Sequence, residues 1–290
     1  QIDAARGRIF RIAPTDQDYR VPEFNFETIE GAIEALRSPT HSARYLAWST
    51  LNSAGVLAEK RLSTLFERTT SNQRLRARAL WLLTKIKGRE EYYVDHALSD
   101  PDEDIRIVAI RAARQTKINL ISLLEKLTDD PSPQVRREVA IALKESDSPK
   151  VPELWTELAI KHDGKDRWYL EALGIAADGR WDSCLRAWLL RVGEKWRSPA
   201  GLDIIWRSRA SQTPIYLSQI LSNTEGHLTE TRKYLRAFDF QIENNEKSRV
   251  LRQLAIREAV GGSEKSAFVA SEALLRIPNL ELSTDMAVSR

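Results

Sequence analysis

Apolar residues recur at helical spacing through most of the 290-residue chain, in runs that are joined by short polar turns. The runs TIEGAIEAL (28–36), LRARALWLL (75–83) and IRIVAIRAA (105–113) place apolar side chains on one face at intervals of three and four. Between residues 26 and 260 no series of runs alternates with the period of two that strands show. The pattern predicts an all-α protein.

The runs come in pairs, and each pair repeats after about 30 residues. The second run of each pair contains an arginine, and these arginines follow one another at spacings of 32, 30, 30 and 31 residues. They are Arg44, Arg76, Arg106, Arg136 and Arg167. Asp or Ser followed by Pro precedes three of them, which is typical of a helix N-terminus. Because one helical hairpin cannot bury its apolar face alone, we expect the pairs to stack around a continuous core.

The two-helix unit, the Asp-Pro turn and the arginine near the start of the second helix resemble HEAT repeats over residues 26–260. This resemblance implies an all-α, right-handed α-solenoid of about seven to eight HEAT-like helical hairpins. In that family a recurrent Asp and Arg form a ladder between adjacent repeats, so the five arginines are the candidate structural ladder. The Asp is present here only at Asp100 and Asp130, with Ser38 in the first unit.

Both ends of the chain depart from the helical period. GRIFRIAP (7–14) predicts a short strand that ends at Pro14, and residues 1–22 are interpreted as an extended, β-like arm left from a preceding β-domain. Residues 23–262 are the predicted HEAT-repeat solenoid. Residues 263–290 are predicted to form a C-terminal capping helix and a tail.

A second resemblance rests on GRIFRIAP, DRWYLEALGIAADGRWD (166–182), DIIWRSRA (203–210) and TRKYLRAFDF (231–240). These segments are similar to large proteins of planctomycete-type bacteria, in which a membrane-bound or secreted dehydrogenase-like β-propeller precedes HEAT repeats and a c-type cytochrome follows. The resemblance implies that the chain is the helical spacer of such a protein, with a periplasmic or cell-surface location. The chain itself holds no CxxCH for haem, so no cofactor is expected.

Composition and motif searches do not favour catalysis. The net charge of +3 is too small to indicate a nucleic-acid or membrane partner, and no apolar run approaches the length of a membrane span. The single cysteine, Cys184, is interpreted as a small buried apolar residue. The four histidines are scattered near separate turns and are expected to face solvent rather than bind a metal. We therefore predict no catalytic, cofactor-binding or metal-binding residues.

One basic stretch, RLRARALWLLTKIKGR (74–89), contains no acidic residue. Arg74 and Arg78 share a helix face, with Lys85 nearly in line, so these three are candidate phosphate contacts. The alternative is that this basic stretch forms a solvent-exposed helix face. The acidic residues that follow it in the sequence favour this alternative.

Six of the eight tryptophans lie between residues 155 and 206. Trp168, Trp181, Trp206, Arg207 and Arg209 are the candidate surface for a partner or a ligand, since Trp and Arg are favoured at interface hot spots. The alternative is that the tryptophans pack the core.

The sequence is interpreted as a non-catalytic scaffold that binds a protein, or neighbouring domains of its own chain, through its concave face. The alternative is a nucleic-acid-binding protein, such as a HEAT-like DNA alkyl-base glycosylase, which would use Arg, Trp and an Asp on the same face. The low net charge disfavours nucleic acid. A third interpretation, a small-ligand groove among the tryptophans, predicts quenching of their fluorescence.

Overall fold

The structure is a computed structural model that describes residues 22–68, 72–116, 118–223 and 228–278. Over these residues sixteen α-helices form eight consecutive hairpins, with no strand, which confirms the predicted all-α solenoid. The strand predicted at 7–14, most of the arm and the tail beyond residue 278 lie outside the described residues, and the domain boundaries stay predictions.

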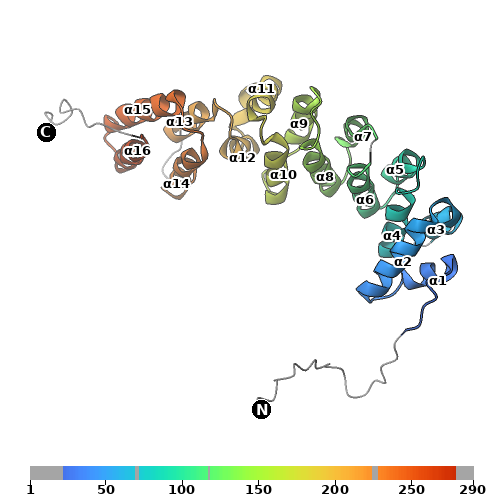
Figure 1. Ribbon diagram of the computed structural model, residues 1–290. Coiled ribbons are helices and arrows are strands. Elements are labelled where there is room, and N and C mark those ends of the chain that lie inside the picture. Colours follow the sequence, from blue (N-terminus) through green and yellow to red (C-terminus); the bar gives the residue numbers. More distant parts are fainter. Residues whose placement is uncertain (1–21, 69–71, 117, 224–227, 279–290) are drawn as a thin grey trace, which may run out of the picture.

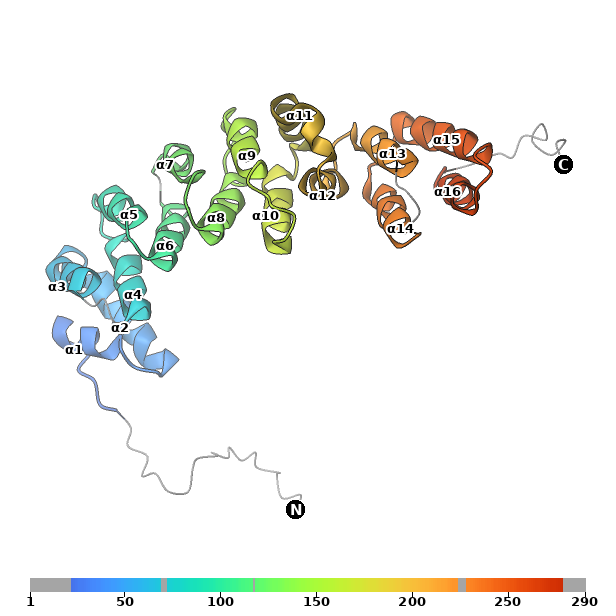
Figure 2. The ribbon, with the colours of Figure 1, turned by 180° about the vertical axis from the view of Figure 1, so that it is seen from behind.

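The hairpins stack side by side into an open arc (Figure 1). The first helix of each hairpin lies on the outer, convex side, and the second lies on the inner, concave side (Figure 2). The outer helices are α1 (Ile29–Ala35), α3 (Val56–Arg68), α5 (Glu90–Leu98), α7 (Leu120–Leu127), α9 (Val151–Ala159), α11 (Trp181–Val192), α13 (Thr213–Asn223) and α15 (Asn245–Ala259). The inner helices are α2 (His41–Ala54), α4 (Gln73–Leu83), α6 (Glu103–Ala113), α8 (Pro133–Leu143), α10 (Arg167–Ala177), α12 (Pro199–Arg207), α14 (Leu228–Ala237) and α16 (Glu264–Leu275).

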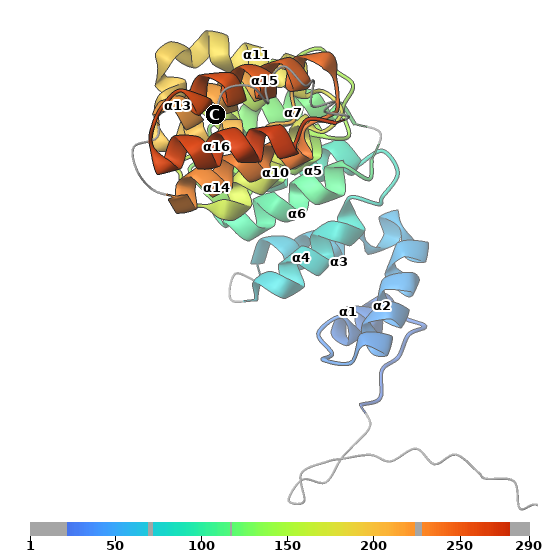
Figure 3. The same cartoon turned by 90° about the vertical axis from the view of Figure 1, so that its left-hand side faces the viewer.

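Two short 3₁₀ helices, η1 (Gly193–Arg197) and η2 (Phe238–Phe240), follow α11 and α14. Seen from the C-terminal end, the later hairpins lie one behind another, and α1 to α4 lie to one side of them because the arc curves (Figure 3). The inner helices therefore present one long concave surface.

Polar side chains start the inner helices at equivalent positions. Asn72, Asp102, Ser132 and Asp166 precede α4, α6, α8 and α10, and each accepts hydrogen bonds from backbone N–H groups of the first turn. Such N-caps satisfy donors that have no partner within the helix and contribute about 1 kcal/mol each. The recurrent turn thus fixes where each inner helix begins.

A single apolar core runs the length of the stack. The third residue after the N-cap is fully buried in three successive inner helices, as Leu75, Ile105 and Val135. The pattern of helical spacing in the sequence therefore maps directly onto the buried face, and each hairpin completes the core of its neighbour.

Charged side chains also join neighbouring outer helices, through residues about one repeat apart. These ion pairs are Arg61–Glu30 at 3.1 Å, Arg89–Glu59 at 3.2 Å, Lys126–Asp95 at 3.4 Å and Lys150–Glu125 at 2.9 Å. Most of their side chains are well exposed, so each contributes little stability alone.

Candidate functional site: a cationic groove on the inner helices

The arginine ladder occupies the fourth position after the N-cap of the inner helices. The Arg106 guanidinium donates from Nε and Nη2 to both carboxylate oxygens of Asp130, at 2.8 Å each. It also donates from Nη1 to the backbone carbonyls of Asp100 and Pro101. One repeat earlier, Arg76 pairs with Asp100 through its two Nη groups, while its Nε donates to the backbone carbonyl of Phe66. Both pairs are nearly buried and join adjacent repeats.

Arg44 and Arg136, which flank Arg76 and Arg106 in the predicted ladder, form only part of these contacts. Arg44 and Arg136 donate to carbonyls of their own preceding turns, those of Ser38 and Asp130 among them. Arg136 meets no carboxylate in the next repeat. Its guanidinium lies 5.6 Å from the ring centre of Tyr169, whose hydroxyl donates to the carbonyl of Leu158.

Arg167 does not belong to this ladder, so the prediction from the arginine spacing is wrong at this position. The turn before α10 is longer than the turns before α6 and α8, so α10 begins at Arg167 itself and Leu170 takes the fourth position after the N-cap. Arg167 instead pairs with Glu171 on the next turn of α10, and its side chain is 61% exposed. Its guanidinium lies over the ring of Trp206, at 4.8 Å from the centre.

The tryptophan-rich region divides between core and surface. Trp181 is buried and packs edge-on against Trp155, with ring centres 5.8 Å apart, so it does not join a surface site as the sequence analysis proposed. Trp168 is 72% exposed, and Trp206 is half-buried. Cys184 is fully buried, and burial raises the pKa of its thiol to about 12.

Trp206, Arg207 and Arg209 do come together, in a groove of about 580 Å³ across three successive inner helices. We call this the α10–α14 groove. Its lining residues are Arg167 and Glu171 of α10, Trp206 and Arg207 of α12, Arg209 of the loop after α12, Lys233 and Arg236 of α14, and Phe240 of η2. Its volume lies within the range of ligand-binding pockets.

Of the described residues that line the groove, Glu171 is the only acidic one, and two arginines share it. Arg207 Nε donates to Glu171 Oε2 at 2.8 Å, and Arg167 pairs with the other carboxylate oxygen. Burial by itself would raise the pKa of Glu171, but the hydrogen bonds from the two arginines bring it below its ordinary value. Gly174 leaves room for the Arg207 side chain, because a β-carbon at position 174 would overlap the guanidinium group.

Arg209 is a second cation at the groove. It forms no ion pair with a carboxylate of the described residues. Its Nη1 donates to the backbone carbonyls of Trp206, Arg207 and Ser208, where α12 ends. The guanidinium also lies 5.1 Å from the ring centre of Phe240. Burial, together with the charge of Arg207, lowers the pKa of Arg209 to about 10. A cation whose pKa is lowered in this way is stabilised by an added negative charge.

The basic stretch at residues 74–89 does not form one site. Arg78 donates to the carbonyl of Leu36 at the end of α1, and burial and the charges of Arg44 and Arg74 lower its pKa. Because α4 ends at Leu83, Lys85 lies beyond the helix and donates to Gln115 instead. Arg78 and Lys85 line different hollows, so the structure does not bring the three candidate phosphate contacts together.

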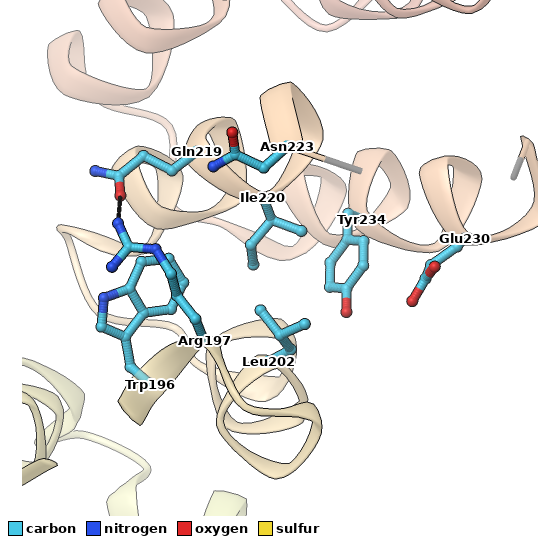
Figure 4. A pocket seen from close by; sticks show the side chains of 8 residues that line it. All are labelled: Trp196, Arg197, Leu202, Gln219, Ile220, Asn223, Glu230 and Tyr234. Atoms are coloured by element: carbon cyan, nitrogen blue, oxygen red, sulfur yellow. Dashed lines mark hydrogen bonds between the residues drawn. The ribbon is translucent and has the colours of Figure 1, made fainter. Parts of the chain in front are cut away.

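Another hollow, of about 330 Å³, lies between α12, α13 and α14 (Figure 4). Leu202, Ile220 and Tyr234 form its apolar side, and Arg197 reaches across the ring of Trp196 to donate to Gln219. The hollow mixes apolar and polar side chains and holds one acid and one base, so its chemistry selects no particular ligand.

His162 corrects the expectation that the histidines face solvent. It is buried with both ring nitrogens lacking a hydrogen-bond partner, and burial lowers its pKa. The Asp203 carboxylate stands 3.7 Å from its Nε2. His41 and His96 are exposed, and His227 lies outside the described residues. Among the residues that the structure describes, no group of three His, Cys, Asp or Glu is placed to hold a metal ion.

The sequence did not indicate that Lys233, Arg236 and Phe240 line the groove, because they come from a weakly repetitive part of the chain. The signal that could have found them is the period itself. Lys233 and Arg236 lie 27 and 30 residues after Trp206, which is about one repeat further along the inner face.

Comparison with known proteins supports the repeat assignment. Residues 91–174 match the family of HEAT repeats. Among solved structures, the chain is similar to one in the complex of CpcE and CpcF of phycocyanin lyase from Nostoc sp. PCC7120, with 19% identity over 92% of this chain and 98% of that chain and a TM-score of 0.29. No curated protein matches the sequence. None of the described helices is long and apolar enough to cross a membrane. The matched residues cover the hairpins from α5 to α10, which bring Arg106 and Asp130 together.

Proposed function

We propose that the chain is a non-catalytic scaffold whose concave face binds a protein, or neighbouring domains of its own polypeptide. The observation that carries this proposal is the α10–α14 groove, where three inner helices of successive repeats expose cations and aromatic rings on one surface. Arg and Trp are the side chains that dominate protein interfaces, and a groove that crosses repeats is how a solenoid presents a binding surface.

We further propose that the chain is the helical spacer of a larger extracytoplasmic dehydrogenase–cytochrome protein. The support for this is the resemblance of segments such as TRKYLRAFDF to the helical region of such proteins. In this arrangement the stack would set the distance between a propeller domain and a cytochrome domain. The flanking gene sequence tests it: a propeller before the chain and a CxxCH after it are expected, and an open reading frame with neither would contradict it.

Nucleic-acid binding, or base excision by a glycosylase, is the second candidate function. The groove has the required Arg and Trp, but a nucleic-acid surface needs phosphate contacts that continue along the protein. In the middle of the concave side the inner helices have their cations paired with acids. The pairs are Arg111–Glu138, Arg114–Glu138, Arg137–Asp166 and Lys144–Asp178. The structure therefore favours a protein partner.

Chemical cross-linking of the full-length gene product, followed by mass spectrometry, tests the scaffold proposal. Lys233 lies in the groove on α14, and Lys126 is an exposed lysine on outer helix α7. We expect Lys233 to form cross-links to residues outside this chain or to a bound protein, and Lys126 to form none. Cross-links from Lys126 without any from Lys233 would place the interaction on the convex face and contradict the proposal.

A further inference from the structure

We propose that the α10–α14 groove binds an acidic segment of the partner protein, in which two or more Asp or Glu side chains pair with the arginines of the groove. This inference rests on the proposed scaffold function and adds the chemistry of the partner. It follows from the charges of the groove, from the way its cations are held and from the charge pairing on the adjacent inner helices.

The cations of the groove exceed its acids. Within the part of the chain that the structure describes, five basic residues line it and Glu171 is the only acidic one. Lys233 has a partner just outside the groove, Asp203, at 3.0 Å. Arg209 and Arg236 form no ion pair with any described residue. The groove therefore keeps an excess of positive charge that a ligand with several carboxylates would neutralise.

The groove already shows how it would hold a carboxylate. Glu171 lies between Arg207 and Arg167, with one carboxylate oxygen on each. The planar guanidinium group presents a fork of N–H donors that matches the two oxygens of a carboxylate, and the hydrogen bonds that form are charge-assisted. A ligand carboxylate placed near Arg209 and Arg236 would repeat this arrangement on the part of the groove that has no acid of its own.

Aromatic rings fix the cations in place before a ligand arrives. Arg167 and Lys233 lie over the ring of Trp206, at 4.8 and 5.5 Å from its centre. The backbone carbonyls at the end of α12 hold Arg209 against Phe240. Because these side chains are already ordered, binding a carboxylate would cost less side-chain entropy than it does at a mobile surface arginine.

The limits of the charged surface favour a peptide over a nucleic acid. The excess charge of the groove does not continue onto the neighbouring inner helices α6 and α8, because their cations are paired with acids of the next repeat. A nucleic-acid strand would need phosphate contacts beyond this region. A short acidic stretch of polypeptide needs only the groove.

Fluorescence anisotropy with a labelled peptide tests the inference directly. The probe is a fluorescein-labelled peptide of alternating Glu and Asp; the matched controls are the same peptide with Gln and Asn, and oligo-dT of equal length. At about 50 mM salt, where charge contacts are screened least, we expect the full chain to bind the acidic peptide and neither control. Binding should weaken as salt is raised.

Two variants locate the binding. Arg236→Glu reverses an exposed charge in the groove, and Arg186→Glu reverses an exposed arginine on outer helix α11. We expect Arg236→Glu to weaken peptide binding roughly tenfold, equal to about 1.4 kcal/mol, and Arg186→Glu to leave it unchanged. Circular dichroism checks that both variants are folded, and Arg236→Gln, which adds no negative charge, replaces Arg236→Glu if it is not.

The outcomes separate the inference from the function on which it rests. Absence of peptide binding, equal loss in both variants, or tighter binding of oligo-dT than of the peptide would overturn an acidic peptide as the occupant. If that happens while Lys233 still forms cross-links in the full-length protein, the scaffold function stands and only the chemistry of the partner is wrong. If Lys233 forms no cross-links while Lys126 does, the scaffold function fails as well.

Discussion

The ion pair between Arg106 and Asp130 is a nearly buried link between two repeats, and Asp130→Ala tests how much it stabilises the stack. The two side chains are 11% and 4% exposed, and they share two hydrogen bonds of 2.8 Å. Asp130 Oδ1 also accepts from the backbone N–H of Ser132, at 2.8 Å. Replacement by alanine removes all three bonds and leaves the guanidinium buried without a counter-charge.

Removal of one partner of a buried ion pair typically costs about 3–5 kcal/mol. We expect a loss of about 3 kcal/mol for Asp130→Ala, at the lower end of this range, because Arg106 keeps its two backbone carbonyl acceptors. The matched control is Asp95→Ala. Its pair with Lys126 also joins two repeats, but it is 3.4 Å long and its side chains are 59% and 66% exposed. We expect that control to cost less than about 0.5 kcal/mol.

Urea unfolding, followed by circular dichroism, gives the two free energies of unfolding. Because a repeat array can unfold in parts, hydrogen exchange in α6 and α8 locates the loss. Arg106→Met combined with Asp130→Ala should recover part of the stability, since it removes the unpaired charge. If Asp130→Ala costs no more than Asp95→Ala, the buried ladder does not stabilise the stack.

Three further predictions concern the tryptophan region and the groove. Trp155→Ala should lower the free energy of unfolding by about 3–5 kcal/mol because Trp155 is fully buried, whereas Trp168→Ala should change it by less than about 0.5 kcal/mol; equal effects in urea unfolding would contradict this. Cys184 should resist maleimide at pH 8 in the native protein and react in urea, since its thiol is buried with a raised pKa; fast native labelling would be the contrary result. In the folded chain the pKa of the Glu171 carboxylate lies below its ordinary value, so its contribution to stability is complete above that ordinary value and is lost as pH falls through the folded pKa. The unfolding free energy of Glu171→Gln should therefore fall less steeply on acidification than that of the original chain. Equal slopes would show that the pairing does not stabilise the fold.

The fold was predictable because each repeat is specified locally. The caps at Asn72, Asp102 and Ser132 fix where the inner helices begin, and the apolar residues that follow fix the buried face. A two-helix unit with one apolar face has to stack on its neighbours, so the solenoid follows from the period alone. The HEAT resemblance is confirmed where the family match lies, over residues 91–174.

The site was predictable only in part, because it depends on details that the period does not contain. Arg167 fits the sequence spacing, but a longer turn places it at the start of its helix and turns it towards Trp206. Trp168 and Trp181 both lie in the tryptophan-rich stretch, and the sequence does not distinguish them. Trp168 is nevertheless exposed, whereas Trp181 packs in the core. Lys233 reaches the groove only because three inner helices lie side by side, which is a property of the stack and not of any one segment.

If the inner helices α10, α12 and α14 form the docking surface of the scaffold, hydrogen–deuterium exchange should locate a bound ligand there. The full chain is compared with and without a saturating concentration of the acidic peptide. We predict slower exchange in α12 and α14, where Arg207 and Arg236 lie, and no change in α6, α8 or the outer helices. Slower exchange confined to the outer helices α11 and α13, or none anywhere in the chain, would contradict this location of the docking surface.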